Sequence, residues 1–182
     1  MKNPLLAFIV KAVLLYIIWF ISYDYLIAPA GTIDRWLNKV VGVQSSVVLN
    51  LIGYDSDTVP GNNQTVVRIN STGMVGVGNP CNGLELFVLF GGFILCFPGN
   101  TRSKLWFIPV GMIIIHVVNV LRSTALALIQ FHDPESLDFN HHYTFTVIVY
   151  AIIFGLWMYW VNRYSGLFAK KEQQNNSVEK GE

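Results

Sequence analysis

The sequence predicts an all-α membrane protein, a bundle of about four transmembrane helices with an amphipathic helix and a short β segment on the outer face. Composition, the lengths of the apolar runs and the placement of Lys and Arg lead to this fold class. Of the 182 residues, 53% are hydrophobic and 13% are charged, about half the share of ~25% found in soluble domains. The net charge of +1 offers no basic surface for nucleic acid. We therefore expect the lipid bilayer, and no nucleic acid, as the partner of this surface.

Four apolar runs are candidates for crossing a bilayer, which needs about 20 residues of helix. They cover residues 5–27, 84–97, 105–129 and 143–161. The second run is short and reaches a spanning length only if its helix begins near Asn79. A cleavable signal peptide is the alternative for the first run. That run is longer than the usual ~7–15 apolar residues of a signal and contains Lys11.

These runs divide the chain into four parts. We expect a first transmembrane helix at 1–27, an outer-face segment at 28–79, a membrane core of three transmembrane helices at 80–163, and a polar cytoplasmic tail at 164–182. Within the outer-face segment, apolar residues at helical spacing predict an amphipathic helix over 32–52. The alternating, β-branched sequence QTVVRIN predicts a short hairpin or strands over 58–78. Gly73, Gly76 and Gly78, at the end of this range, predict a mobile approach to Cys81.

The orientation follows from the positive charges in the short flanks of the runs. Four spans bring these charges to one side of the membrane: Lys2, Arg102, Lys104, Arg163, Lys170 and Lys171. That side is predicted to be cytoplasmic. The chain is therefore expected to be a multi-pass protein of the inner (plasma) membrane, with both termini in the cytoplasm and the segment 28–79 outside.

Cys81 is the first candidate for chemistry. Asn79 and Pro80 suit the N-cap and first position of the second spanning helix. The thiol would then lie in the first helical turn, where the helix dipole lowers its pKa. Cys96 falls near the other end of the run and is expected to be an inert small hydrophobe. Two cysteines cannot build a disulfide framework or a four-ligand zinc site, and we expect no metal and no organic cofactor.

Arg122 and a histidine pair complete the candidate site. A charged residue inside a span is a functional hypothesis by default, and Arg122 lies in the outer half of the third run. His141 and His142 directly precede the fourth run. Under the predicted topology a thiol, a guanidinium and an imidazole meet at one membrane depth, which are the parts of an acyl-transfer site. The choice between the two histidines stays open, with His141 preferred.

Two polar neighbours are supporting candidates. Asn119 lies one helical turn before Arg122 and is expected to orient it. Glu85 lies one turn after Cys81 on the same face and is expected to pair with Arg122. A purely structural Glu85–Arg122 ion pair is the alternative reason for both charges.

At these positions the sequence resembles the exosortase/archaeosortase family of membrane transpeptidases. The matching pieces are Pro80-Cys81-Asn82-Gly83-Leu84, Asn119-Val120-Leu121-Arg122 and a histidine just before the last apolar run. They occur in the family's order, and the similarity covers about residues 78–160. The resemblance adds Asn82 to the supporting residues and makes the chain a compact member, since many exosortases have more spans.

The resemblance implies a membrane cysteine transpeptidase or protease, a hydrolase that cleaves a C-terminal sorting signal of exported proteins. Its substrates would be membrane-anchored and carry a short recognition motif, a hydrophobic span and a basic tail. Cys81 would form an acyl-thioester, which an acceptor nucleophile, for example an amine on a lipid or glycan carrier, then takes. The family model gives Arg122 a proton-donor role. Stabilising the oxyanion suits its permanent charge better, and the sequence leaves that choice open.

Two functions from other classes fit the same composition. A non-enzymatic multi-pass membrane partner protein would use its polar residues for packing alone, with Glu85 and Arg122 as a structural ion pair. A thiol oxidoreductase needs paired cysteines on one face of the membrane. Cys96 is predicted at the opposite face from Cys81, which disfavours the oxidoreductase.

Overall fold

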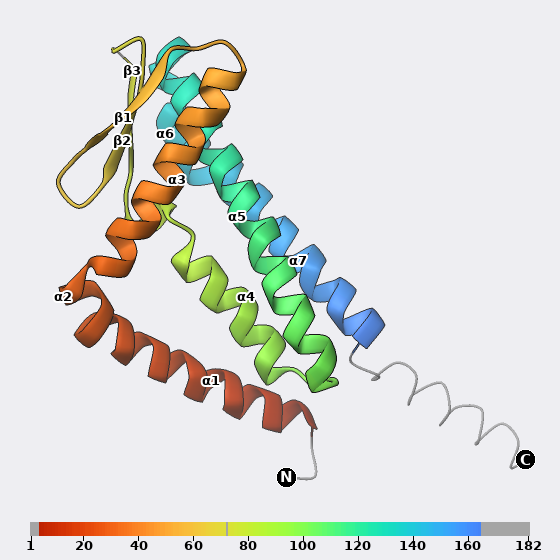
Figure 1. The fold of residues 1–182 in the computed structure, drawn as a ribbon. Helices are drawn as coiled ribbons and strands as arrows, with labels where there is room; N and C mark the ends of the chain where they lie inside the picture. The colour runs from red at the N-terminus through yellow and green to blue at the C-terminus, as the bar shows by residue number, and fades with distance from the viewer. Residues whose placement is uncertain (1–3, 72, 165–182) are drawn as a thin grey trace, which may run out of the picture.

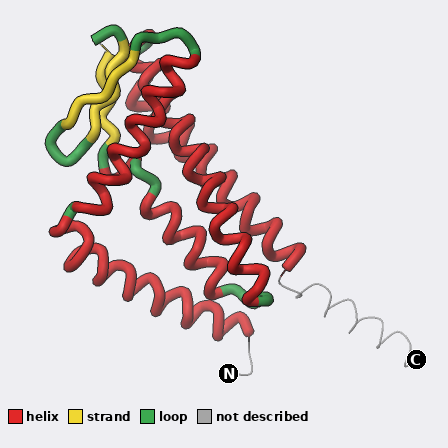
Figure 2. Tube along the Cα trace, viewed as in Figure 1, coloured by secondary structure: helices red, strands yellow, loops and turns green. Residues whose placement is uncertain are grey.

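The computed structural model describes residues 4–71 and 73–164. The predictions made for Lys2, Lys170 and Lys171 and for the polar tail after 164 fall outside the described residues. Long helices run through most of the described chain, and the strands are confined to one end (Figures 1 and 2).

Five long helices and a small sheet make up the fold. The helices are α1 (Pro4–Ser22), α3 (Thr32–Leu51), α4 (Leu84–Cys96), α5 (Thr101–His132) and α7 (Phe145–Tyr164). Short turns join them: η1 (Tyr23–Ile27), α2 (Ala28–Ala30), η2 (Asn79–Cys81), η3 (Pro134–Ser136), α6 (Leu137–Phe139) and η4 (Asn140–Thr144). The strands are β1 (Ser56–Pro60), β2 (Thr65–Ile69) and β3 (Gly73–Val77).

Three helical segments of the described chain are long and apolar enough to cross a membrane. They are Leu6–Ala30, Thr101–His132 and Pro134–Tyr164. The expected count of four rests on α4, which has 13 residues. At 1.5 Å per residue it is about 20 Å long, against a hydrocarbon core of about 30 Å. The described residues therefore contain three candidate spans by length and composition and one shorter apolar helix, and the count of four spans is not confirmed.

Two apolar clusters hold these elements together. One joins the sheet to α3 and α5 and consists of Val41, Leu49, Val67, Ile69, Val77, Val120 and Ala127. The other joins α4, α5 and α7 and consists of Phe90, Ile94, Phe107, Ile115, Val149, Ile153 and Trp160. Because α5 contributes to both, its 32 residues fix the sheet relative to the helix bundle. The outward side chains of α1, α5 and α7 are largely apolar, as contact with lipid requires.

The sheet is antiparallel, in the order β1-β2-β3. β2 lies inside the predicted strand. β3 lies within the range 58–78 in which a hairpin or strands were predicted, and Gly73 and Gly76, from which we expected a mobile approach to Cys81, belong to a strand paired with β2. Val77 is buried against α3 and α5, and the side chain of Gln64 lies over Gly76. Pairing with β2 and burial of valines thus stabilise a strand despite its glycines.

Helix α3 buries several polar side chains beside its apolar core residues and exposes several apolar side chains. Its buried positions include Asp34, Asn38, Ser45 and Ser46, whereas Ile33, Trp36, Val43, Val47 and Leu51 are exposed. A water-facing helix of a globular protein shows the opposite distribution. The outward face of α3 therefore suits lipid, and its inward face supplies hydrogen bonds to the neighbouring loop.

Both ends of the described chain lie at the end of the molecule opposite the sheet. α1 begins there, α7 ends there, and the turn between α4 and α5 lies there too (Figure 1). Arg102, Lys104 and Arg163 belong to these segments. This places the described cations that predict the cytoplasmic side at one end, away from the sheet.

Gly111 of α5 leaves room for the ring of Phe90 on α4, and a side chain at position 111 would test this packing. A Cβ at Gly111 would overlap the ring of Phe90, which is fully buried. We expect Gly111→Ala to destabilise the bundle by about 1–3 kcal/mol through overpacking. Gly155→Ala is the matched control, because a Cβ on α7 there meets open space. Thermal aggregation of the detergent-solubilised protein measures both. Equal stability of the two variants would contradict the packing described here.

Candidate active site

Cys81 is the last residue of a short 3₁₀ turn that precedes α4. The turn η2 ends at Cys81, Gly83 adopts a left-handed conformation with φ of 85°, and α4 begins only at Leu84. The expectation that Asn79 caps the second helix and that Cys81 sits in its first turn is therefore wrong. The left-handed Gly83 interrupts the helical path, so the thiol stands outside the first turn of α4.

Side-chain amides tie this turn to two helices. Asn119 Nδ2 of α5 donates to the carbonyl oxygen of Cys81 at 2.7 Å. Asn82 is fully buried; its Nδ2 donates to Asp34 Oδ1 of α3 at 2.7 Å, and its Oδ1 accepts from the N–H of Leu84 at 2.9 Å. Asn119 thus holds the Cys81 backbone and does not orient Arg122 as expected. Asn82 points away from the thiol and anchors the turn.

A second set of contacts fixes the start of the turn. Asn38 Nδ2 donates to Asn79 Oδ1 at 3.2 Å and to the carbonyl oxygen of Asn63 at 3.0 Å. The hydroxyl of Tyr23 donates to Asp34 Oδ2 at 3.4 Å. Two polar residues of α3 therefore hold the Cys81 turn from one side, and α5 holds it from the other.

Cys81, His141 and Arg122 meet at one point. Cys81 Sγ lies 3.2 Å from His141 Nε2. Arg122 Nη2 lies 3.6 Å from that sulfur and 3.3 Å from the same imidazole nitrogen. An arginine always donates, so Nε2 of His141 accepts and its proton resides on Nδ1. The thiol lies within reach of the same unprotonated nitrogen, so Cys81 and Arg122 share Nε2 as acceptor and the thiol has a base beside it.

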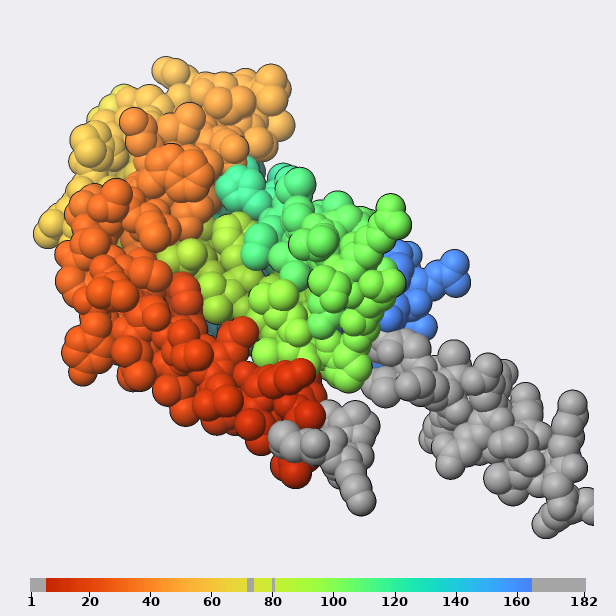
Figure 3. Space-filling model, turned by 60° about the horizontal axis from the view of Figure 1, so that its bottom comes forward, coloured from red at the N-terminus to blue at the C-terminus, as the bar shows by residue number. Residues whose placement is uncertain are grey.

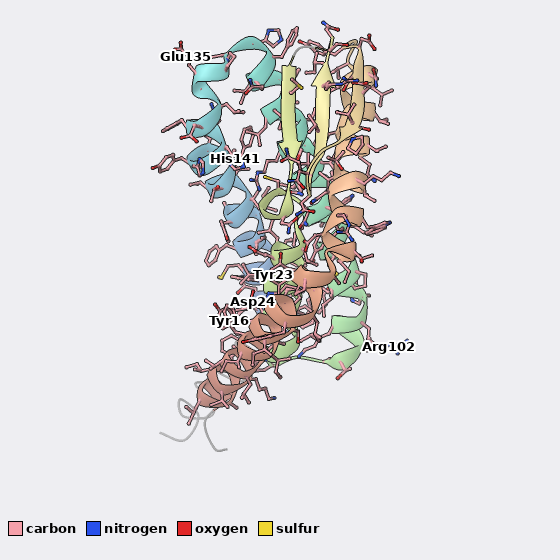
Figure 4. The ribbon with its side chains drawn as sticks, turned by 90° about the vertical axis from the view of Figure 1, so that its left-hand side faces the viewer. Tyr16, Tyr23, Asp24, Arg102, Glu135 and His141 are labelled. Carbon is pink, nitrogen blue, oxygen red and sulfur yellow. The ribbon has the colours of Figure 1, made fainter. Side chains whose placement is uncertain are left out.

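The structure separates the two histidines. Both belong to the π-turn η4, a distortion that is frequent at functional sites. His141, which is labelled in Figure 4, lies in η4 just before α7, and its Nε2 contacts Cys81 Sγ at 3.2 Å. His142 is exposed, and its Nδ1 lies 3.1 Å from Asp138 Oδ1. Of the two candidates, His141 is the one that contacts the thiol.

Glu85 does not pair with Arg122 in the structure. Within residues 4–71 and 73–164, ion pairs join Arg68 to Asp57 and His142 to Asp138. Glu85 is exposed near Tyr23 of η1 and lines a cavity between α4 and α7 together with Arg122. The expected ion pair is nevertheless absent, because the guanidinium of the half-buried Arg122 is directed at Cys81 and His141.

The environment of the thiol acts on its pKa in two directions. Burial raises the pKa of Cys81, and the nearby guanidinium of Arg122 lowers it by a smaller amount, so the pKa stands above its usual value. The sequence predicted a lowered pKa from the helix dipole, and this prediction is wrong. The thiol is neutral at rest and depends on a base and on Arg122 to become a thiolate.

Two cavities open on opposite sides of the Cys81–His141 contact. The sheet-side cavity, about 320 Å³, lies between β3 and the segment from Pro134 to His141 and contains Cys81 and Ser123. The helix-side cavity, about 310 Å³, lies between α4 and α7 and contains Arg122, His141 and Glu85. In the described part of the chain, no group of three His, Cys, Asp or Glu side chains could hold a metal ion.

Sequence reasoning missed Asp34 and Asn38. Both are polar, almost fully buried and one helical turn apart on α3. The available signal was that these two polar residues are four positions apart on a helix that exposes several apolar side chains. It indicates an inward polar face that needs partners inside the protein.

Arg122 is expected to control the reactivity of the thiol. Removing its charge in Arg122→Gln takes away the contribution that lowers the Cys81 pKa, so that pKa should rise further. A higher pKa leaves less thiolate at neutral pH, so iodoacetamide should alkylate Cys81 more slowly. The pH at which the alkylation rate reaches half its maximum should rise. Arg68→Gln, on the sheet and away from the thiol, is the control. A midpoint that stays unchanged in Arg122→Gln would contradict the electrostatic role.

Comparison with known proteins supports the resemblance found in the motifs. The family model for transmembrane exosortases matches residues 4–159, which includes the Cys81 turn, Arg122 and His141. Neither curated proteins nor solved structures gave a match. Because the match extends over most of the chain, this protein belongs to the transmembrane exosortase family.

Proposed function

We propose that this protein is a membrane cysteine transpeptidase that cleaves a C-terminal sorting signal of exported proteins at the outer face of the membrane. The observation that carries the proposal is the contact of Cys81 Sγ with His141 Nε2, with Arg122 Nη2 next to both atoms. A nucleophile, a base and a fixed cation are brought together from three separate segments of the chain. Family membership supports the same reaction class.

The first half-reaction forms an acyl-enzyme. His141 Nε2 takes the thiol proton, and the thiolate of Cys81 attacks the carbonyl carbon of the scissile peptide bond. The resulting oxyanion is stabilised by Arg122, which stays charged and therefore does not serve as the acid. The C–N bond then breaks, the protonated His141 gives its proton to the leaving amine, and the acyl group remains on sulfur as a thioester.

The second half-reaction releases the product. An acceptor nucleophile, which we propose to be an amine on a lipid or glycan carrier, loses its proton to His141 and attacks the thioester carbonyl. The C–S bond breaks, the sulfur leaves as a thiolate and is reprotonated by His141. If water takes the acceptor's place, the same steps give hydrolysis.

A groove beside the site fits the hydrophobic span of such a substrate. It has a volume of about 530 Å³ and lies between α1, α4 and α7. Figure 3 shows α1 lying across this side of the molecule next to α4. The groove shares Glu85, Leu86 and Tyr150 with the helix-side cavity. A span bound there would bring the residues just before it to Arg122 and His141.

The membrane orientation belongs to the same proposal. Arg102, Lys104 and Arg163 belong to segments at the end away from the sheet, which the positive-inside rule makes cytoplasmic. The sheet and Cys81 then face outward, where an exported substrate arrives. The non-enzymatic alternative relied on a Glu85–Arg122 ion pair, and the geometry of those two residues does not favour it.

Replacement of the thiol tests the function directly. The probe is an exported, epitope-tagged protein of the same genome that carries the three-part C-terminal signal. In cells with Cys81→Ala, we expect the full-length probe to accumulate and cleavage to fall by roughly a thousandfold or more. Cys96→Ala is the matched control, because Cys96 is buried at the other end of α4. Normal cleavage by Cys81→Ala would refute the transpeptidase proposal.

Single alanine variants separate the two histidines. His141→Ala removes the base next to sulfur, and general-base catalysis contributes roughly a hundredfold or more. We therefore expect probe cleavage to drop by at least that factor. His142→Ala removes only an exposed contact to Asp138 and should leave cleavage within about twofold of normal, since exposed pairs contribute little. The reverse ranking would assign the base to His142.

A further inference from the structure

The free edge of the sheet borders the active site. β3 is an edge strand of the three-stranded sheet in the described chain, and Cys81 follows its last residue, Val77, by four positions. The sheet-side cavity has residues 74–77 on one wall and Leu137, Asp138 and His141 on the other. In Figure 4 the strand nearest the helix that carries His141 runs down toward the site.

The hydrogen bonds at the ends of β1 and β2 fix which backbone groups face that edge. Asn70 N–H donates to the Asp55 carbonyl, and Gly61 N–H donates to the Gln64 carbonyl. Hydrogen-bonded pairs alternate along an antiparallel ladder. In the register of the sheet, the even-numbered residues of β2 therefore bond to β1, and the odd-numbered residues bond to β3.

The same alternation continues across β3. Val67 of β2 pairs with Val75, so the odd residues of β3 direct their N–H and C=O groups at β2. Met74 and Gly76 therefore direct theirs away from the sheet. Both line the sheet-side cavity, and the Met74 side chain is 58% exposed.

The opposite edge of the sheet is strand β1, and the backbone of its first residue, Ser56, is already hydrogen-bonded. Ser56 of β1 directs its N–H and C=O away from β2, and the side-chain amide of Asn50 on α3 bonds to both, at 3.0 and 2.8 Å. An unpaired strand edge is a template for another chain. The sheet therefore offers such a template along β3, at the edge that leads to the nucleophile.

We propose that the substrate segment just before the scissile bond binds as an added strand on β3, through the backbone of Met74 and Gly76. The proposal rests on the proposed transpeptidase function. Strand addition gives affinity through main-chain hydrogen bonds, with side-chain pockets adding specificity. Five residues of β3 are about 16 Å long, enough to hold a short recognition motif in extended form.

The direction of the added strand follows from the two cavities. β3 runs toward Cys81. A substrate whose C-terminal span lies in the groove beside α4 must pass from the sheet-side cavity, across Cys81, into the helix-side cavity. Its chain then runs in the same direction as β3, so the added strand is parallel.

Proline substitution on the two sheet edges tests the pairing. Met74→Pro removes an N–H that faces the cavity and puts the proline ring in its place. Thr58→Pro is the matched control, because Thr58 has the same outward position on β1. Proline is tolerated on an edge strand where its N–H faces outward. Both variants should accumulate in the membrane and label with maleimide at Cys81 like the unmodified chain.

We expect Met74→Pro to cleave the tagged probe at least tenfold more slowly and Thr58→Pro to cleave it normally. Normal cleavage by Met74→Pro would overturn the strand pairing and leave the transpeptidase function standing. Loss of cleavage in both variants, with normal maleimide labelling, would likewise overturn it, since β1 has no part in the proposed pairing.

Photo-crosslinking gives a second measurement that does not depend on the proline variants folding. Benzoylphenylalanine replaces Met74, or Thr58 as control, in the Cys81→Ala chain together with the uncleaved probe. Crosslinks from position 74 should map to the residues just before the cleavage site, and none should form from position 58. Crosslinks only to the apolar span, equal crosslinks from both positions, or none from 74 would overturn the proposal. Cleavage of the probe by Cys81→Ala would instead refute the transpeptidase function.

Discussion

The structure depends on the hydrogen bonds that hold the turn carrying Cys81, where the chain leaves regular strand and helix geometry beside an apolar bundle. Irregular backbone is tolerated there only when protein partners replace water. The turn from Asn79 to Gly83 meets this requirement through Asn38 and Asp34 on one side and Asn119 on the other. These contacts hold the thiol of Cys81 in a fixed place ahead of the first turn of α4. The inward polar face of α3 exists because this turn needs partners.

The same constraint explains why the thiol is neutral at rest. A buried sulfur loses the solvation that a thiolate requires, so its pKa rises. Arg122 opposes this effect and lies within reach of the imidazole as well. Under the proposed mechanism, the charges form when a substrate carbonyl is present, and the oxyanion then gives the guanidinium a closer anionic partner.

The sequence identified the parts that long patterns or rare residues reveal. Apolar runs and helical spacing located the helices, and intramembrane charge pointed to Arg122. The path of the chain near Cys81 was harder, because Asn-Pro-Cys fits a helix start equally well until the left-handed Gly83 is seen. The range predicted for strands, 58–78, includes β3, but its glycines also indicated mobility because glycine disfavours strands locally, whereas its pairing with β2 and the burial of Val77 are long-range effects. Likewise, nothing local distinguishes His141 from His142; the direction of the π-turn does.

The arrangement of the two cavities bears on how transfer could outcompete hydrolysis. Under the proposed mechanism, the retained part of the substrate stays paired to β3 while its cleaved span leaves through the helix-side cavity. The thioester on Cys81 is then covered on the sheet side by the acyl chain itself, and its open side contains Arg122 and His141. The helix-side cavity joins the groove between α1, α4 and α7, whose walls are mainly apolar. An acceptor carried on a lipid can approach along the groove, whereas water is disfavoured there. The geometry thus couples departure of one membrane-bound group to arrival of another at the same base.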